Sequence, residues 1–331
     1  MKTQSLTIAL ATTLFASAAF AQMPEPASLL LYPVVRSDQS TISIISVTNT
    51  NPNPGASTNV RFVYNTTIPN PGDPFNPLGC TQFDRREFLT PADTVSVSML
   101  CHTAMFSAEG YLVVTAQNPN FFNQDWSFNH LAGSIIHIDG ATNLTFSTNA
   151  IPFRSLLDFQ TPTDVNQNGR SDLDGVEYES VRDYVILDHA LGLINPSINL
   201  VNLTGGPNDK NTVSIVAWND NEFPLSVVKT FTCWFDERAS TISPIFTDAF
   251  LVTTPNDPSE LDLLCIGSSF TEPYWIRFDS IRVEDPAGNI VSNDGALAGM
   301  VSGCPGGRVY WMDGPLQLNG SFPNGNVKVP F

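Results

Sequence analysis

Positive charge is scarce in this chain. Its 331 residues include 15 Lys and Arg against 32 Asp and Glu, which gives a net charge of −17 at pH 7. Apart from the N-terminal Lys2, the lysines are Lys210, Lys229 and Lys328. A chain this acidic repels phosphate backbones and anionic membrane surfaces, so we expect no nucleic-acid partner. The same acidity is compatible with binding of a divalent cation.

Long apolar runs are also lacking beyond the N-terminus. Lys2, the apolar stretch Leu6 to Phe20 and the A-x-A sequence ending at Ala21 are typical of a secretory signal peptide. We predict cleavage that leaves Gln22 first, a mature net charge of −18, and a secreted, periplasmic or cell-surface location. The stretch is too short and too rich in Ala and Thr for a membrane anchor, and no later segment approaches ~20 apolar residues. We therefore expect no membrane span in the mature chain.

Catalytic signatures are missing as well. The histidines show no zinc-site spacing, and there is no G-x-S-x-G elbow, phosphate-binding glycine loop or dinucleotide fingerprint. Strand alternation would place the neighbours Cys101 and His102 on opposite faces, which disfavours a nucleophile–base pair. The sequence thus favours a protein that is not an enzyme and has no catalytic residues. A secreted hydrolase of unrecognised type, using a pair of acidic side chains, is an alternative.

Strand patterns fill most of the chain. Apolar residues recur at every second position, and turn-rich stretches with many of the 25 prolines separate them. This pattern predicts an all-β, antiparallel fold, with one short helix over 176–191. The expected inward positions are Ile42/Ile44, Val60/Phe62/Tyr64, Val95/Val97/Met99, Tyr111/Val113, Val213/Ile215, Phe231/Cys233/Phe235, Ile276/Phe278 and Val309/Trp311.

Matched segments divide the chain into two halves. They occur in the same order and at similar spacing, which indicates a duplication. We predict two tandem related antiparallel β-sandwich (Ig-like) domains over 22–155 and 196–331, joined by a connecting segment over 156–195 and preceded by the signal peptide over 1–21. Residues 41–151 and 212–318 should have the same strand order. The matches are Thr41-Ile42-Ser43-Ile44 with Thr212-Val213-Ser214-Ile215, Asn49 with Asn219, Thr90-Pro91 with Thr254-Pro255, Cys101 with Cys265, and Leu131-Ala132-Gly133 with Leu297-Ala298-Gly299.

The cysteines are Cys80, Cys101, Cys233, Cys265 and Cys304. In an exported chain they favour disulfides over metal sites or catalysis. Because Cys80 and Cys101 fall in the same half, we expect them to be bonded to each other. Cys265 is then expected to bond with Cys233 or with Cys304. The cysteine left over is either a buried free thiol or the site of an intermolecular bridge.

The most specific motif is Asp164-Val165-Asn166-Gln167-Asn168-Gly169-Arg170-Ser171-Asp172. It matches the first nine positions of an EF-hand-type loop, in which alternate oxygens surround a cation and the glycine permits a sharp turn. We predict a structural Ca²⁺ site with ligands from Asp164, Asn166, Asn168, the Arg170 carbonyl and Asp172. The twelfth position is Gly175 in place of the bidentate Glu, and Asp174 or Glu177 would have to substitute in another geometry. The alternative is an Asx-rich turn that binds nothing.

Two tryptophans are expected to face away from the strand cores. If Phe235 and Ile276 point inward, then Trp234 and Trp275 point outward. Exposed indoles on a flat sheet stack on sugar rings or anchor protein interfaces. The alternative is that the neighbouring domain or a loop covers them, since tryptophans are highly buried on average.

Part of the chain resembles a group of exported bacterial proteins known only as hypothetical. The resemblance covers about residues 29 to 190, implies export and a β-rich fold, and implies no activity. The segments that carry it are Leu31-Tyr32-Pro33, the Thr-x-Ser-Ile segment before Asn49, Leu89-Thr90-Pro91, Phe128-Asn129-His130-Leu131-Ala132-Gly133, Asn149-Ala150-Ile151-Pro152 and Leu173-Asp174-Gly175-Val176-Glu177-Tyr178.

These features favour an exported, non-enzymatic structural, adhesive or surface-interaction protein, stabilised by calcium and disulfides. A carbohydrate-binding module using Trp234 and Trp275 is the second candidate. The expected partner is accordingly a surface glycan or another extracellular protein.

Overall fold

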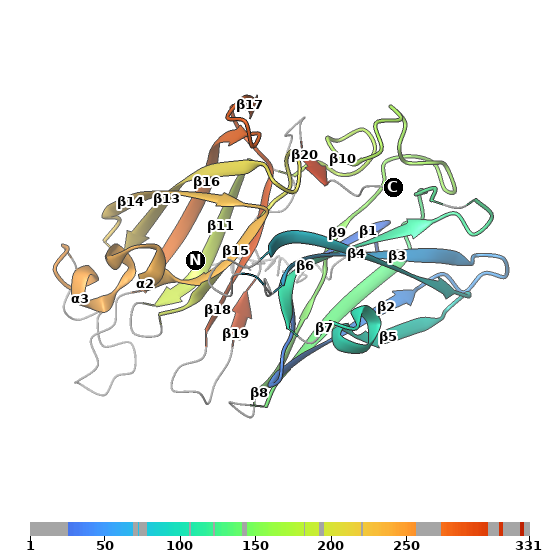
Figure 1. Cartoon of the computed structure of the whole chain (residues 1–331), viewed down its shortest axis with the longest axis horizontal. Helices are drawn as coiled ribbons and strands as arrows, with labels where there is room; N and C mark the ends of the chain where they lie inside the picture. Colours follow the sequence, from blue (N-terminus) through green and yellow to red (C-terminus); the bar gives the residue numbers. More distant parts are fainter. Residues whose placement is uncertain are drawn as a thin grey trace, which may run out of the picture.

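The chain folds into two β-lobes that lie side by side (Figure 1). The computed structural model describes residues 26–68, 72, 78–105, 107–121, 123–140, 144–181, 183–191, 195–219, 221–255, 273–303, 311–313 and 325–327. The predicted signal peptide, Cys265, Cys304 and Val309 lie outside the described residues.

The first lobe is one antiparallel sheet folded over on itself. The strand path is β4-β3-β6-β1-β2-β7-β8, with β5 paired to β2 and β9 paired to β1. The register between β1 and β2 consists of one Cα pair, Ser37 with Ile42, so the sheet turns a corner there and its two parts face each other. The elements are β1 (Leu29–Ser37), β2 (Thr41–Asn49), β3 (Thr58–Ile68), β4 (Leu78–Leu89), β5 (Thr94–Ser98), α1 (Met99–Thr103), β6 (Ala108–Gln117), β7 (Leu131–Asp139), β8 (Leu144–Asn149) and β9 (Ile151–Phe153).

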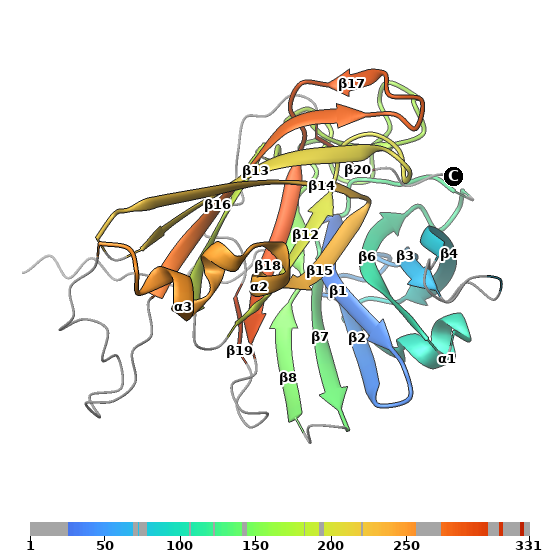
Figure 2. The ribbon, with the colours of Figure 1, turned by 60° about the vertical axis from the view of Figure 1, so that its left-hand side comes forward.

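The second lobe consists of two separate antiparallel sheets (Figure 2). One has the order β11-β16-β13-β14, with β17 on β16, and the other has the order β15-β12-β18-β19. The elements are β11 (Tyr184–Leu191), β12 (Ser197–Asn202), β13 (Lys210–Asn219), β14 (Pro224–Thr232), β15 (Trp234–Arg238), α2 (Ala239–Ile242), η2 (Pro244–Phe246), α3 (Asp248–Leu251), β16 (Pro273–Glu284), β17 (Ile290–Ser292), β18 (Leu297–Gly303) and β19 (Trp311–Asp313).

A small third sheet ties the C-terminal part of the chain to the segment between the lobes. Strand β10 (Ser171–Leu173) pairs antiparallel with β20 (Gly325–Val327), with Asp172 opposite Asn326. Both strands lie near the junction of the two lobes (Figure 1).

Each lobe has an apolar core at its expected positions. Val60, Phe62 and Tyr64 are buried in the first core, and Val213 and Ile215 in the second. The prediction of a β-rich, sandwich-like fold is therefore confirmed. In β2 the expected phase is wrong by one residue, because Ile45 and Val47 face the core and Ile42 is 36% exposed. Ile44 and Ile45 are adjacent and both apolar, so alternation alone does not decide which of them points inward.

The helix predicted over 176–191 is wrong. Residues 184–191 form β11, which pairs with β16 in the second lobe and buries Val185 and Leu187 there. Over residues 184–187, the buried Val185 and Leu187 alternate with the half-buried Tyr184 and Ile186, which is the period of a strand and not of a helix. The second lobe thus begins earlier than the expected boundary at residue 196.

The predicted common strand order of 41–151 and 212–318 is also wrong for the described residues. In the first lobe, β2 pairs with β7. In the second lobe, β13 pairs with β16, while β18, the counterpart of β7 by sequence, pairs with β12 in the other sheet. The two lobes therefore have different sheet topologies despite their matched segments.

One local arrangement does occur in both lobes. Asn49 ends β2, and its side-chain amide donates to the carbonyl oxygens of Ala56 and Thr90 at 2.7 and 2.9 Å. Asn219 ends β13, and its amide donates to Thr254 Oγ1 and to the Pro255 carbonyl oxygen at 3.1 and 3.0 Å. Both asparagines are buried. The matched Asn and Thr-Pro segments thus form equivalent anchors of a strand end.

The first lobe contains a buried imidazole that links fold stability to pH. His137 on β7 is 1% exposed, and its Nδ1 lies 3.0 Å from Ser43 Oγ on β2. Ser43 Oγ also accepts the backbone N–H of Arg36 at 2.8 Å, which leaves the hydroxyl hydrogen for Nδ1 of a neutral ring. Burial, together with the nearby Arg36 charge, lowers the pKa of His137 to about 3.

We predict that acid weakens the fold through His137. Because its folded pKa lies below the unfolded value, the stability contribution is complete above about pH 6.5 and is lost as the pH falls from there toward about 3. Between about pH 7 and pH 5 this group alone should remove about 2 kcal/mol from the free energy of unfolding. Urea unfolding at both pH values should show a correspondingly smaller loss in His137→Gln. Equal losses in the two proteins would contradict the assignment.

Candidate functional site

The two lobes share an apolar cluster that we call the interlobe cluster. From the first lobe it takes the outward side chains of β1, β3, β6 and β9, and from the second it takes residues of β12 and β18 and of the bend before β15. Strand β1 is therefore buried on both faces, and each of its residues except Arg36 is buried. The interlobe cluster comprises Leu29, Leu31, Val63, Tyr111, Val113, Ile151, Phe153, Leu173, Tyr178, Val181, Val201, Leu203, Cys233, Ala296 and Ala298, with Cys80 and Trp234 packed against it.

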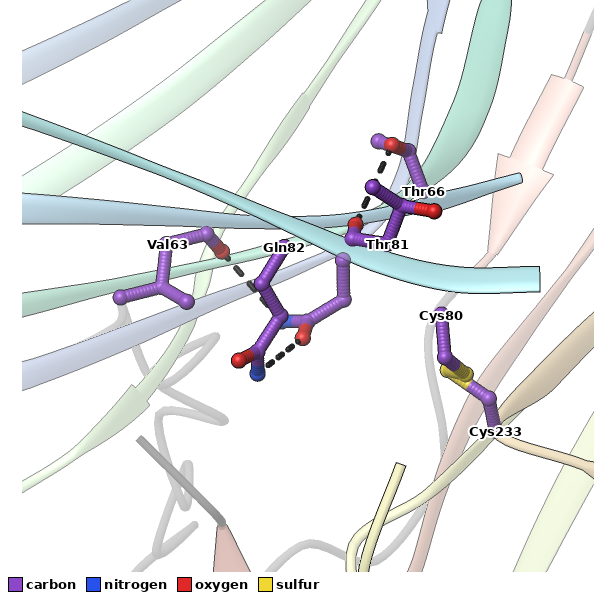
Figure 3. The surroundings of a disulfide bond; sticks show 7 residues. Val63, Thr66, Cys80, Thr81, Gln82 and Cys233 are labelled. Carbon is purple, nitrogen blue, oxygen red and sulfur yellow. Dashed lines mark hydrogen bonds between the residues drawn. A yellow bond between two sulfur atoms is a disulfide. The ribbon is translucent and has the colours of Figure 1, made fainter. Parts of the chain in front are cut away.

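A disulfide joins the lobes at this cluster. Cys80 on β4 is bonded to Cys233, with 6.1 Å between their Cα atoms and a sequence separation of 153 (Figure 3). Beside the bond, Thr66 Oγ1 donates to the Thr81 carbonyl oxygen at 3.4 Å and holds β3 to β4. Cys233 has a φ of 67° and lies where the chain passes from β14 in one sheet to β15 in the other. Phe231 therefore faces the second core, while Cys233 faces the interlobe cluster.

This pairing corrects the one expected from sequence. The predicted Cys80–Cys101 bond is wrong, and so is the alternative in which Cys265 bonds with Cys233. Cys101 is an exposed free thiol on α1. The remaining alternative, a Cys265–Cys304 bond, concerns residues outside those described. Although Cys101 is nearer to Cys80 in sequence, docking of the lobes places Cys80 next to Cys233 of the second lobe.

An ion pair adds a polar contact to the junction. Arg36 Nη2 on β1 binds Asp236 Oδ2 on β15, and Arg36 Nε lies 3.7 Å from Glu109 Oε2. The Asp236 side chain is 4% exposed. Burial raises the pKa of Asp236, and the Arg36 charge opposes that rise. Removal of Arg36 would leave the buried Asp236 carboxylate without its ion-pair partner, which is costly.

The predicted calcium loop closes on itself through hydrogen bonds. Asp164 Oδ1 and Oδ2 accept the backbone N–H groups of Asn168 and Gly169 at 2.9 and 3.1 Å. The side-chain amides of Asn166 and Asn168 both donate to Asp172 Oδ2, at 2.7 and 2.9 Å. Gly169 has a φ of 73°, the left-handed conformation that the sharp turn requires. The first, third, fifth and ninth positions thus point to the same interior.

A residue beyond the motif completes this arrangement. Glu177 is 1% exposed, and its carboxylate accepts the N–H of Val165 at 2.7 Å and that of Asp172 at 3.2 Å. Burial raises the pKa of Glu177 to about 7. Asp174 Oδ1 instead accepts the N–H groups of Val176 and Glu177 in its own turn. The sequence left Asp174 and Glu177 equivalent, and the fold brings only Glu177 into the loop.

As the side chains lie in this structure, no three His, Cys, Asp or Glu residues of the described part are grouped closely enough to hold a metal ion. The carboxylates of Asp164, Asp172 and Glu177 each accept hydrogen bonds from backbone N–H groups or asparagine amides of the loop. The geometry is that of a closed Asx-rich loop whose side chains converge.

The two tryptophans have different surroundings. Trp234 on β15 is half-buried and packs against the interlobe cluster. Trp275 on β16 is 36% exposed. Its indole stacks on that of Trp218, the cross-strand neighbour on β13, with ring centroids 4.1 Å apart and planes inclined by 12°. Because each indole covers one face of the other, they form a ridge and not a flat platform.

Trp218 was missed by the sequence analysis. It alternates with the buried Val213, Ile215 and Ala217 of β13, so its outward direction was readable from the strand pattern. On the same sheet, Arg277 contacts the Tyr184 ring, with 4.4 Å between the guanidinium carbon and the ring centroid. Arg277 also binds the Asp279 carboxylate through two nitrogens at 2.6 to 2.9 Å. Polar groups therefore lie near the indole pair.

Cys101 and His102 form no contact that suggests catalysis. The His102 ring turns toward the first core, where Nδ1 lies 2.8 Å from Tyr64 Oη and the ring packs edge-on against Phe62. Its Nε2 lies 3.4 Å from Glu87 Oε1. Burial lowers the pKa of His102. These contacts fix α1 against β3 and β4.

We predict that peptide mapping without reduction recovers Cys80 linked to Cys233 and Cys101 open to alkylation. Replacement of both bonded residues in a Cys80→Ser/Cys233→Ser variant should lower the free energy of unfolding by up to about 5 kcal/mol, because the bond closes a loop of 153 residues. Cys101→Ser, the control, should unfold like the parent protein. A peptide that links Cys80 to Cys101 would refute the pairing.

Comparison with known protein families gives no match to this chain, and no curated protein matches it. Among the described residues, none of the helices has the length and apolar character needed to cross a membrane.

Proposed function

We propose that this chain is an exported, non-enzymatic structural, adhesive or surface-interaction protein whose two lobes act as one rigid unit. The observation that carries this proposal is the burial of β1 on both faces, between the first core and the interlobe cluster. Interfaces between independently moving domains are usually smaller and more polar. A shared apolar layer of this kind suits a scaffold that holds its two lobes at a fixed spacing.

The disulfide supports the proposed location. Cys80 and Cys233 are bonded across the junction, and such bonds persist in oxidising compartments outside the cytoplasm. The N-terminal sequence that resembles a signal peptide points the same way. The finer assignment of the lobes to Ig-like sandwiches belongs to this proposal and rests on the facing antiparallel layers around each core.

Carbohydrate binding is the second candidate function. It is favoured by the partly exposed Trp218–Trp275 ridge and by Arg277 and Asp279 on the same sheet. The indole face that is not covered by the other tryptophan can stack on a pyranose ring. The Arg277–Asp279 pair can supply hydrogen bonds to the sugar hydroxyls. Trp234 is not part of this site, because it packs against the interlobe cluster.

We predict export with removal of the first 21 residues. Expression of the whole chain in a bacterial host should place it outside the cytoplasm, with Gln22 as its N-terminal residue by sequencing. Ala21→Arg should accumulate as the uncleaved precursor, because a large charged residue does not fit the small-residue cleavage site. Ala11→Ser, within the apolar stretch, is the control and should be processed normally. Cytoplasmic retention of the parent chain, or turnover of polysaccharide or ester substrates by the mature protein, would overturn the proposed function.

For the second candidate, a glycan array with the mature protein should give a binder whose affinity falls at least tenfold, or 1.4 kcal/mol, in Trp275→Ala and Trp218→Ala. Trp234→Phe is the matched control and should bind as the parent does, since that indole lies at the junction. Binding that depends on Trp234 and ignores Trp275 would contradict this site.

A further inference from the structure

The loop over 164–172 contains a buried carboxylate oxygen without a hydrogen-bond partner. Asp172 is 5% exposed, and its Oδ1 is buried with no partner among the described residues, whereas Oδ2 accepts both loop asparagine amides. An unsatisfied buried carboxylate oxygen costs free energy, and buried groups of this kind are normally paired with a donor, a water or an ion. Asp172 thus has unused capacity to accept at Oδ1, on the same carboxylate whose Oδ2 binds the two loop asparagines.

Negative charge in the loop also lacks compensation. Asp164, Asp172 and Glu177 have no Lys, Arg or His within ion-pair distance among the described residues. Their partners are the N–H groups of the loop and two asparagine amides. Neutral donors satisfy single oxygens, but they do not neutralise three carboxylates. A divalent cation does both.

We propose that Asp164, Asn166, Asn168, Asp172 and Glu177 form a calcium site that fixes the C-terminal strand β20 to the junction between the lobes. Calcium prefers six to eight oxygen ligands in a flexible geometry, and this set supplies carboxylate and amide oxygens, with the Arg170 carbonyl at the seventh position. A half-turn of each asparagine amide about its last side-chain torsion exchanges nitrogen for oxygen and points an acceptor where the donor now lies. Binding of the ion in this way also requires the carboxylates of Asp164, Asp172 and Glu177 to move closer together than they lie in this structure. Glu177 takes the part that the twelfth residue has in an EF-hand.

The coupling to β20 follows from the position of Asp172. It lies on β10, opposite Asn326 of β20, and the next residue, Leu173, is in the interlobe cluster. Tyr178 follows Glu177, belongs to the same cluster and donates to Thr163 Oγ1 at 3.0 Å, just before the loop. An ion that orders the loop therefore orders both the β10–β20 pair and the packing of Leu173 and Tyr178. This inference does not rest on the proposed function.

Titration calorimetry of the mature protein with CaCl₂ tests the site. We expect one ion per chain with a Kd on the order of 10⁻⁴ to 10⁻³ M, the range of extracellular modules, and weaker binding of Mg²⁺, which demands a stricter octahedron. The Tm should rise by a few degrees in about 10 mM CaCl₂ and return on chelation. No heat and no change in Tm in the parent protein would overturn the proposal.

Two variants distinguish the role of Glu177 in calcium binding from that of Asp174. Glu177→Gln should weaken calcium binding at least tenfold, while Asp174→Asn should bind as the parent does. Both changes remove one negative charge, and Asn at 174 keeps the oxygen that accepts the N–H of Val176. Equal weakening in the two variants would refute the role of Glu177 as a ligand. Circular dichroism without calcium checks that each variant is folded.

Hydrogen exchange tests the link to the C-terminal strand. Calcium should slow exchange of the amides over 171–173 and 325–327 in the parent protein and in Asp174→Asn. If only the loop over 164–170 gains protection, the ion binds without fixing β20, and that part of the proposal is wrong. Wild-type measurements alone decide this point, so it does not depend on the folding of Glu177→Gln.

Discussion

Burial of β1 on both faces is the constraint on which the rest of this structure depends. On one face, Leu30 and Tyr32 enter the first core, and on the other, Leu29 and Leu31 enter the interlobe cluster. A strand covered on both sides reads as a continuous apolar run and not as an alternation, and Leu29-Leu30-Leu31 is such a run. Because this strand belongs both to the first core and to the interlobe cluster, the lobes cannot be separated without exposing one of its faces to water.

What the sequence predicted well is local. The inward-facing positions predicted for β3, β13 and β16 follow from the alternation of apolar residues. The turn over 164–172 follows from a motif of nine consecutive residues. Even the missed Trp218 was accessible to the same rule. Alternation leaves the phase of β2 ambiguous because Ile44 and Ile45 are adjacent and both apolar. The apolar residues from Val176 to Leu191 occur at several spacings, which do not distinguish the strand β11 from a helix.

What the sequence could not predict depends on how the lobes dock. Cys233 meets Cys80 because the bend between β14 and β15 turns toward the first lobe, and Trp234 is covered for the same reason. Asp174 accepts the N–H groups of Val176 and Glu177 in the turn before Glu177. Its carboxylate is therefore engaged in that turn, and only Glu177 extends into the loop. The matched Asn and Thr-Pro segments predict the same sheet topology in the two lobes. In the structure, Asn49 and Asn219 make equivalent local hydrogen bonds, but the strand orders around them differ.

The 153-residue separation of Cys80 and Cys233 has a consequence for biogenesis. Under the export proposed above, the first half of the chain enters an oxidising compartment before the second, with Cys80 reduced and Cys101 the nearest thiol in sequence. The native bond can form only after β12 to β15 have folded and docked, so an early oxidation would trap a short, non-native loop. Slow oxidation or a disulfide isomerase would then favour the native pairing, and a closed Cys80–Cys233 bond would mark a molecule in which both lobes are in place.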